Sequence, residues 1–422
     1  MAVKVYQGDS VAVAQVHTGS VKTGTATSGL SSRDAQIILT DEAGVTTTVG
    51  FTLSASETSD ITIGMAAAWN AHGNAAVSRV TAASTSTTVQ LTADEAGAPF
   101  SVTFDASSGN TTLIWTTSDV GTATTANSGP NDWAIAENWL AGVVPAENDD
   151  VVLPAGAPSI LYGLNNSGTS VGSFKVQKGY AGTLGGTDKA YLKVTIKTNG
   201  VTEFGGSGKS WVDLGASGVK PIVTESYLPG IGEYGLNLRC TSVVDLYVLK
   251  GNVGVGTDKD DVTTRVSNFH VSFIDSQETD AKVAIGENVQ SVAPGAIVEL
   301  DQNGGEVTNQ GAPIVTLNIL SGTYTGESDG TVTTANVYGK MVHNSNGTIA
   351  TLNLSGEFDC SNDPRTKTIT DFNAFSGFNI NLDNGNPLSV TITNGIDFEQ
   401  CGFEDGTIKA GKNFTMPNLA AV

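Results

Sequence analysis

The sequence predicts a mainly β fold, in which a small N-terminal α+β domain is followed by a right-handed parallel β-helix. Glycine makes up 50 of the 422 residues, well above the usual share of about 7%. Thr, Ser, Val and Asn fill much of the remainder, which favours strands and turns over helices. In addition, Gly322, Gly339 and Gly356 end three similar short segments at a constant interval of 17 residues.

Residues 1–125 are expected to form the α+β domain. A hairpin is predicted over 35–49, where the sequence alternates around an Asp-Glu-Ala-Gly turn. Strands near 87–93 and 99–105 are expected to form a second hairpin around another Asp-Glu-Ala-Gly turn. The one convincing helix of this half lies between the hairpins, at 60–72. Its expected cap, apolar face and stop are Asp60, then Ile61, Met65, Ala68 and Trp69, then Gly73.

Residues 126–150 are expected to be a Trp-containing linker and cap. The segment 116–130 is rich in Thr, Ser and Gly and ends in Pro, which is typical of an extended connector. Trp133 and Trp139 follow in a short turn or helix. Because large aromatic side chains bury much area, the pair is expected to cover the end of a hydrophobic core.

Residues 151–422 are expected to form the β-helix. Three segments share the pattern Thr-x-Asn, a hydrophobic residue and then a glycine, at 316–322, 334–339 and 351–356. A strand–turn unit that repeats every 17–22 residues is typical of a solenoid, whose neighbouring units share one core. The asparagines at matching positions are expected to form a ladder along the axis. A β-sandwich is the alternative, with shorter spacings between its strands.

Composition and charge exclude several classes of partner. The formal net charge is −21, from 21 basic and 42 acidic residues. No cluster of Lys or Arg appears, so binding to nucleic acid or to an anionic membrane is not expected. The N-terminal stretch lacks a sustained apolar region, and no segment approaches about 18 consecutive apolar residues. The chain is therefore expected to carry no signal peptide, although its composition looks extracellular.

No candidate active site stands out. Three acidic clusters were considered, and each is expected to be structural or solvated rather than catalytic: Asp149 with Asp150; Asp258, Asp260 and Asp261; and Asp397, Glu399, Glu404 and Asp405. Asp149 and Asp150 point to opposite faces if they lie on a strand, and residues 256–262 are expected to be a solvated turn. We therefore expect no enzyme activity, no cofactor and no specific metal site.

The cysteines and histidines are scattered in the same way. Cys240, Cys360 and Cys401 are expected to be buried thiols, because none has the spacing of a metal site. The four histidines are expected to face the surface or solvent. These are His17, His72, His270 and His343.

One segment carries a resemblance to a known family. Residues 128–153 read SGPNDW, then ENWLAGVVPAENDDVVL, and Leu-Tyr-Gly-Leu follows at 161–164. This stretch resembles uncharacterised bacteriophage virion proteins, in which a short N-terminal module and such a segment precede a Gly-rich β-solenoid. The resemblance implies a structural virion protein that is made in the host cytoplasm and resides on the capsid surface.

Two roles are compatible with that resemblance. The first is a capsid decoration or cement protein that binds the major capsid protein, expected as a homotrimer. The alternative is a tail fibre or tailspike-type protein that binds host surface polysaccharide. Sugar-binding fibres expose aromatic platforms, whereas Trp211 is the only one of five Trp residues in the predicted β-helix. This favours decoration.

Overall fold

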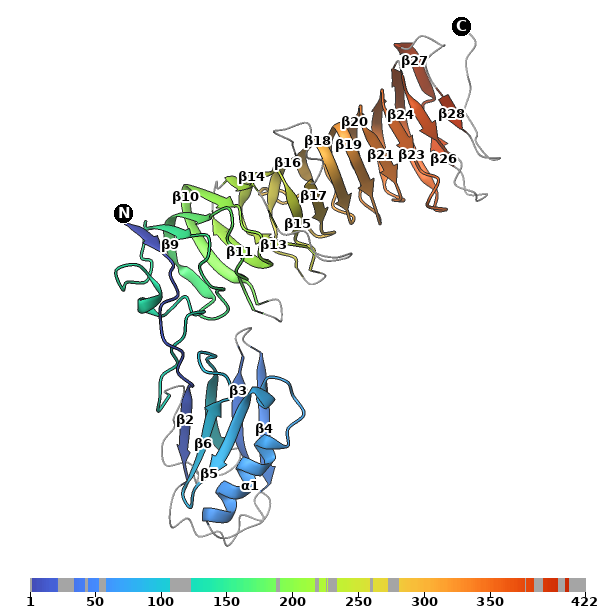
Figure 1. The fold of residues 1–422 in the computed structure, drawn as a ribbon. Helices are drawn as coiled ribbons and strands as arrows, with labels where there is room; N and C mark the ends of the chain where they lie inside the picture. The colour runs from blue at the N-terminus through green and yellow to red at the C-terminus, as the bar shows by residue number, and fades with distance from the viewer. Residues whose placement is uncertain are drawn as a thin grey trace.

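The computed structural model is mainly β, with 55% of its residues in strands, many of them parallel, and 5% in helices. An elongated stack of strands carries a smaller module at its N-terminal end (Figure 1). The structure describes residues 2–21, 34–41, 45–52, 58–106, 123–186, 190–216, 220–224, 226, 234–258, 261–271, 281–375, 377–382, 390–400 and 407–409.

The N-terminal module contains one α-helix and two three-stranded antiparallel sheets, in the orders β2-β6-β5 and β4-β3-β7. Its apolar core is separate from that of the stack. Its elements are β2 (Val16–Ser20), β3 (Asp34–Thr40), β4 (Thr46–Thr52), α1 (Thr58–Asn70), a 3-10 turn (Val77–Arg79), β5 (Val80–Ser84), β6 (Thr88–Ala93) and β7 (Ser101–Ala106).

The first predicted hairpin is confirmed, because β3 and β4 pair antiparallel. The second is wrong, since β6 pairs with β2 and β5 whereas β7 pairs with β3. The helix begins at Thr58, two residues earlier than expected, so Asp60 lies in its first turn. Its apolar face buries Trp69, whose indole N–H donates to the Val80 carbonyl at 2.6 Å.

The stack consists of two ladders of parallel strands. The first ladder runs through β1 (Val3–Val5), β8 (Asp150–Leu153), β9 (Asn165–Val176), β10 (Leu192–Phe204), β12 (Lys220–Val223), β14 (Val243–Val248), β16 (Val266–Val271), β18 (Ile297–Asn309), β19 (Ile314–Gly326), β20 (Val332–Val337), β22 (Thr348–Leu354), β24 (Lys367–Phe375), β26 (Val390–Ile392) and β27 (Ile396–Gln400).

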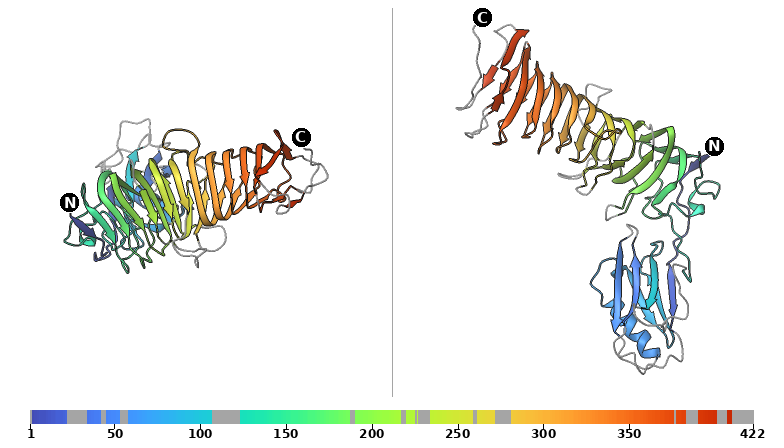
Figure 2. Two further views of the ribbon diagram at one scale, coloured as in Figure 1. Left: turned by 90° about the horizontal axis from the view of Figure 1, so that it is seen from above. Right: turned by 180° about the vertical axis from the view of Figure 1, so that it is seen from behind.

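The second ladder shares the long strands β9, β10, β18 and β19 with the first, and the chain alternates between the two ladders as the stack grows (Figure 2). Its other strands are β11 (Ser210–Ala216), β13 (Leu236–Cys240), β15 (Gly251–Val255), β17 (Ala281–Ile285), β21 (Lys340–His343), β23 (Glu357–Asp359), β25 (Asn379–Asn381) and β28 (Thr407–Lys409).

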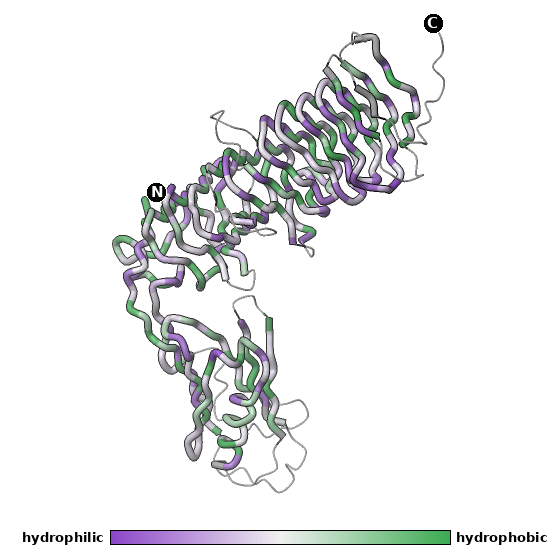
Figure 3. Tube along the Cα trace, turned by 45° about the vertical axis from the view of Figure 1, so that its right-hand side comes forward, coloured by the Kyte–Doolittle hydropathy of each residue, from purple (hydrophilic) through white to green (hydrophobic). Residues whose placement is uncertain are grey.

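Alternation along each strand builds one continuous core between the ladders. In β20 and β22, for example, Ala335 and Val337 lie level with Leu352 and Leu354, and all four are fully buried. Figure 3 shows the matching alternation of hydrophobic and hydrophilic residues along the stack. The 17-residue glycine period has a steric cause. A Cβ added to Gly356 would lie 2.2 Å from the Gly339 carbonyl oxygen, so a side chain there would collide with the neighbouring turn.

The first strand of the chain belongs to the stack rather than to the N-terminal module. β1 pairs with β8, and the following Tyr6 packs edge-on against Trp139 with ring centroids 5.0 Å apart. Trp133 and Trp139 are buried at the end of the stack's core, beside a 3-10 turn (Ala136–Asn138), as expected for a cap. The boundary expected at residue 125 therefore leaves out β1, and the module is an insertion between β1 and β8.

Two chain passages connect the module to the stack, and they run side by side. Val13 forms antiparallel backbone pairing with Ser128, and Val16 does so with Thr125. The Ser10 and Ser128 hydroxyls also lie 2.5 Å apart. The described part of the expected connector, from residue 123 onward, is thus one side of a two-stranded ribbon.

Candidate binding face

The outward side chains of the first ladder form two columns on β14, β16, β18, β19, β20, β22 and β24, which we call the outer face. The parallel register places equivalent residues level with one another from strand to strand. One column is Asp245, Asn268, Glu299, Thr316, Thr334, Thr351 and Asp371, and the other is Tyr247, His270, Asp301, Asn318, Asn336, Asn353 and Asn373.

A continuous ladder of side-chain amides runs along the second column. Each Nδ2 donates to the Oδ1 of the preceding residue, at 2.8 Å from Asn373 to Asn353 and at 2.7 Å from Asn353 to Asn336. Asn336 donates to Asn318 at 2.7 Å, and Asn318 donates to Asp301 at 2.8 Å. The asparagine ladder expected from the Thr-x-Asn repeats is confirmed.

A cluster of ionisable side chains lies at the N-terminal end of the amide ladder. The His270 ring stacks on Tyr247 with centroids 4.6 Å apart. Its Nδ1 lies 3.2 Å from Asp301 Oδ2, and its Nε2 lies 3.6 Å from Asp245 Oδ1. Lys220 Nζ lies 2.7 Å from the other Asp245 oxygen. Three strands thus contribute to one array around His270.

The electrostatics of this cluster hold Asp245 ionised. Burial works to raise the pKa of Asp245, but hydrogen bonds from Asn268 and Lys220 outweigh burial and lower the pKa. The hydrogen bond to Asp245 in turn raises the pKa of Lys220. A carboxylate that stays ionised is a poor general acid. The outer face is therefore suited to hydrogen bonding rather than to proton transfer.

The sequence analysis did not bring His270, Asp245 and Asp301 together. They lie 25 and 31 residues apart, so no local motif connects them. The signal that would have found them is the Thr-x-Asn frame continued backwards. It aligns Thr316-Leu-Asn318 with Glu299-Leu-Asp301, Asn268-Phe-His270 and Asp245-Leu-Tyr247.

The first acidic cluster of the sequence analysis is split between two structural tasks. Asp149 accepts hydrogen bonds from the backbone N–H of Ala2 at 2.9 Å and of Ala146 at 3.1 Å. Asp150 instead accepts the Ser173 hydroxyl at 2.7 Å. Asp149 thus fixes the chain terminus against the cap, and Asp150 links β8 to β9.

The second acidic cluster is partly buried, so the expected solvated turn is wrong. Asp261 is only 4% exposed and accepts hydrogen bonds from the backbone and hydroxyls of Thr263 and Thr264. Arg239 lies over the Tyr191 ring and donates to Asp258 at 2.8 Å. Burial works to raise the pKa of Asp261, but these hydrogen bonds and Arg239 lower it. The carboxylates anchor the segment.

The remaining candidates divide between described and undescribed residues. Asp397 is exposed, while Asp260, Glu404, Asp405 and Cys401 and the side chain of Glu399 lie outside the described residues. Cys240 and Cys360 are buried free thiols, as expected. His17 and His343 are each only 1% exposed, so the expectation of surface histidines is wrong for these two. Both lie on strands at inward-facing positions, which the scattered pattern did not reveal.

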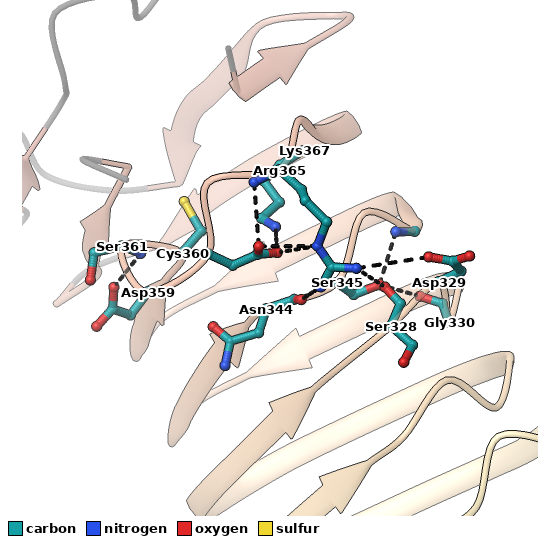
Figure 4. A network of polar contacts seen from close by, with 12 residues as sticks. Ser328, Asp329, Gly330, Asn344, Ser345, Asp359, Cys360, Ser361, Arg365 and Lys367 are labelled. Atoms are coloured by element: carbon teal, nitrogen blue, oxygen red, sulfur yellow. Dashed lines mark hydrogen bonds and ion pairs between the residues drawn. The ribbon is translucent and has the colours of Figure 1, made fainter. Parts of the chain in front are cut away.

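A second polar network lies at a turn near the C-terminal end of the stack (Figure 4). Arg365 donates to both oxygens of Asp363 at 3.0 Å, and also to the Ser328 and Asn344 carbonyls of two neighbouring turns. Lys367, whose side chain has no exposed surface, contacts the same Asp363 carboxylate. Burial works to raise the pKa of Asp363, but these cations lower it to about 2.

A cavity of about 440 Å³ lies between the N-terminal module and the stack. The module contributes Phe100 and Arg79, and the stack contributes Leu161 and Tyr162. Its volume is in the range of small-molecule sites. Its polar lining carries both signs of charge, so it does not indicate one class of ligand.

Comparisons with known proteins give no relative. No protein-family model, no curated protein and no solved structure matches this chain. Within the described ranges, no group of three or more His, Cys, Asp or Glu residues is arranged to hold a metal ion. No helix in that part of the chain has the length and apolar character needed to span a bilayer.

Proposed function

We propose that the parallel stack is a right-handed β-helix. The support is its topology. The chain alternates between the two ladders, and equivalent positions recur after 17 residues, as from Thr334 to Thr351 or from Lys340 to Glu357. A chain that returns to the same ladder once per repeat, with one core inside, winds as a solenoid. Parallel crossover connections are almost always right-handed.

We propose further that the protein is a structural component of a bacteriophage virion that decorates or cements the head. The observation that carries this proposal is the construction of the stack. One core and one amide ladder run through it, which makes it a stiff spacer. The module attached at one end suits an anchor on the major capsid protein, and the resemblance of residues 128–153 supports a virion location.

The test of this role is the stoichiometry of the protein in purified particles. A head decoration protein is expected at a copy number comparable with that of the major capsid protein, and on the capsid surface in labelling experiments. A copy number matching a tail structure would reject the head assignment.

Non-enzymatic action and a homotrimeric state belong to the same proposal. Exposed apolar side chains such as Val201 and Val262, which are 61% and 63% exposed, suit contacts with further copies. Light scattering should give three times the 43.2 kDa chain mass. Neutral and acidic polysaccharides should stay intact on incubation with the protein. Depolymerisation that is abolished by one carboxylate substitution would replace this proposal with a tailspike depolymerase.

Glycan binding by a tail fibre is the second candidate, and one observation favours it. Tyr338 is 60% exposed and follows directly on β20, whose outward residues Thr334 and Asn336 belong to the outer face. An exposed aromatic ring beside amides and hydroxyls is a common way to bind sugars. The partner in this case would be a host surface polysaccharide.

A further inference from the structure

Part of the outer face is uncharged although the protein is strongly acidic. Between β18 and β24 the two columns hold only six neutral residues, which we call the Thr/Asn tract: Thr316, Asn318, Thr334, Asn336, Thr351 and Asn353. Glu299 and Asp301 bound the tract on one side, and Asp371 bounds it on the other. An anionic ligand would therefore meet repulsion at both ends.

The amides of the tract retain unused hydrogen-bonding capacity. An Asn side chain has two N–H donors and two oxygen lone pairs. Asn336 and Asn353 each use one N–H toward the preceding residue and one lone pair toward the following residue. Each therefore has one donor and one acceptor left, within the described residues. Because parallel strands lie about 4.8 Å apart, these free groups recur regularly along the axis.

Apolar side chains border the tract on both margins. Tyr338 and Leu320 are 60% and 53% exposed. They follow Val337 and Ile319, which are level with each other in β20 and β19. On the opposite margin Val298 and Val315 are 49% and 40% exposed. A ligand on this face meets alternating hydrogen-bonding groups in the centre and apolar surface at the edges.

We infer that the Thr/Asn tract binds a neutral, linear polysaccharide whose chain runs along the ladder axis. This inference rests on the glycan-binding candidate above. Sugar hydroxyls both donate and accept, which matches the one free N–H and one free lone pair of each amide. The C–H faces of sugar rings pack on aromatic and aliphatic groups, which Tyr338 and Leu320 supply. A ligand with a linear repeat fits best, because the protein groups themselves repeat in one direction.

Two substitutions test the tract from different sides. Thr334→Glu adds a charge at the centre of the tract, and Tyr338→Ala removes the exposed ring from its margin. Thr325→Glu is the matched control, since Thr325 lies level with Val342 on the second ladder and is half-exposed like Thr334. Thermal unfolding of all variants, followed by circular dichroism, identifies any that fail to fold.

The probes are cellulose, chitin and mannan as neutral polysaccharides, and alginate as an anionic one, in sedimentation assays with the full chain. The expected result is binding of at least one neutral polymer, with affinity reduced tenfold or more in both T334E and Y338A and unchanged in T325E. Binding that survives both substitutions would place the glycan elsewhere and reject the tract, while leaving a glycan-binding role intact. Preference for alginate would also reject the inference. No binding to any probe would reject both.

Discussion

The carboxylate of Asp301 accepts a hydrogen bond from Asn318 Nδ2 at 2.8 Å, and this contact sets the direction of the whole amide ladder. A carboxylate can only accept, so Asn318 must turn its N–H group toward it and its oxygen toward Asn336. The same choice then passes to Asn353 and Asn373. One acidic residue at the first step thus orients four amides.

Asp301→Asn removes the acceptor that orients the ladder. We expect the free energy of unfolding to fall by about 1–2 kcal/mol, because a hydrogen bond to a charged group is replaced by a neutral one and the amides lose their common direction. Chemical denaturation measures this change. The control is Glu306→Gln, which disturbs an exposed ion pair with Lys282 and should cost well under 1 kcal/mol. Equal losses in both variants would contradict the orienting role.

Acid should destabilise the stack through His343. Burial, reinforced by the nearby Lys367 charge, lowers the pKa of His343 from 6.5 to about 4. The folded state therefore favours the neutral ring, so this contribution to stability is complete above pH 6.5 and is lost as the pH falls toward 4. The expected loss is about 3 kcal/mol, measurable by urea unfolding at a series of pH values.

His343→Leu provides the control for this pH dependence. The variant should show no loss between pH 6.5 and 4 from this position. It should keep the decline at lower pH, where Asp363, with its pKa of about 2, loses its charge and its ionic contacts. An unchanged slope between pH 6.5 and 4 in the variant would assign the effect to another group.

The two partners of the buried ion pair should respond unequally to substitution. Asp363→Asn leaves the Lys367 ammonium fully buried without a counter-charge, which costs about 3–5 kcal/mol. Lys367→Met leaves Asp363 bonded to Arg365 at 3.0 Å, so its cost should be smaller, about 1–2 kcal/mol. Unfolding in urea compares them. The reverse order would show that Arg365 does not compensate Asp363.

Removal of one whole repeat should leave the stack folded. Deletion of residues 340–356 joins Gly339 to Glu357, in the same way that Gly356 joins it in the full chain. β23 would then take the place of β21 beside β19, and β24 that of β22 beside β20. Circular dichroism should show the same strand signal per residue and one cooperative transition. Deletion of residues 340–347 is the mismatched control, because it brings β22 into the second ladder, and it should lose that transition.

The sequence predicted the repeating part of the fold better than the connections. The Thr-x-Asn segments at 316–322 and 351–356 foretold both the strands and the amide ladder, because each repeat presents the same residues to the same neighbours. The pairing of β6 with β2 rather than β7 could not be read from the Asp-Glu-Ala-Gly turn at 94–97. A short turn also suits a crossing between two sheets, and only packing against α1 decides.

The candidate face was harder to predict than the fold. His270 and Asp301 are neighbours only through the parallel register of β16 and β18, across a chain segment with no repeat signal. Asp261 looked solvated because its neighbours in sequence are polar. Its burial depends on Arg239, which comes from another strand. Local patterns report which way a strand residue points, but not what the next turn of chain places beside it.

The position of β1 has a consequence for synthesis on the ribosome. Val3 pairs with Asp150, so the first strand must wait for the complete N-terminal module and the Trp cap before its partner emerges. Later strands need only one further repeat, as Thr334 does for Thr351. Closing the long loop is entropically the least favourable pairing of the stack. We expect the module to fold first and to hold β1 close to β8. The module then acts as a timer for the start of the stack, and the remaining strands are added in the order in which they are translated.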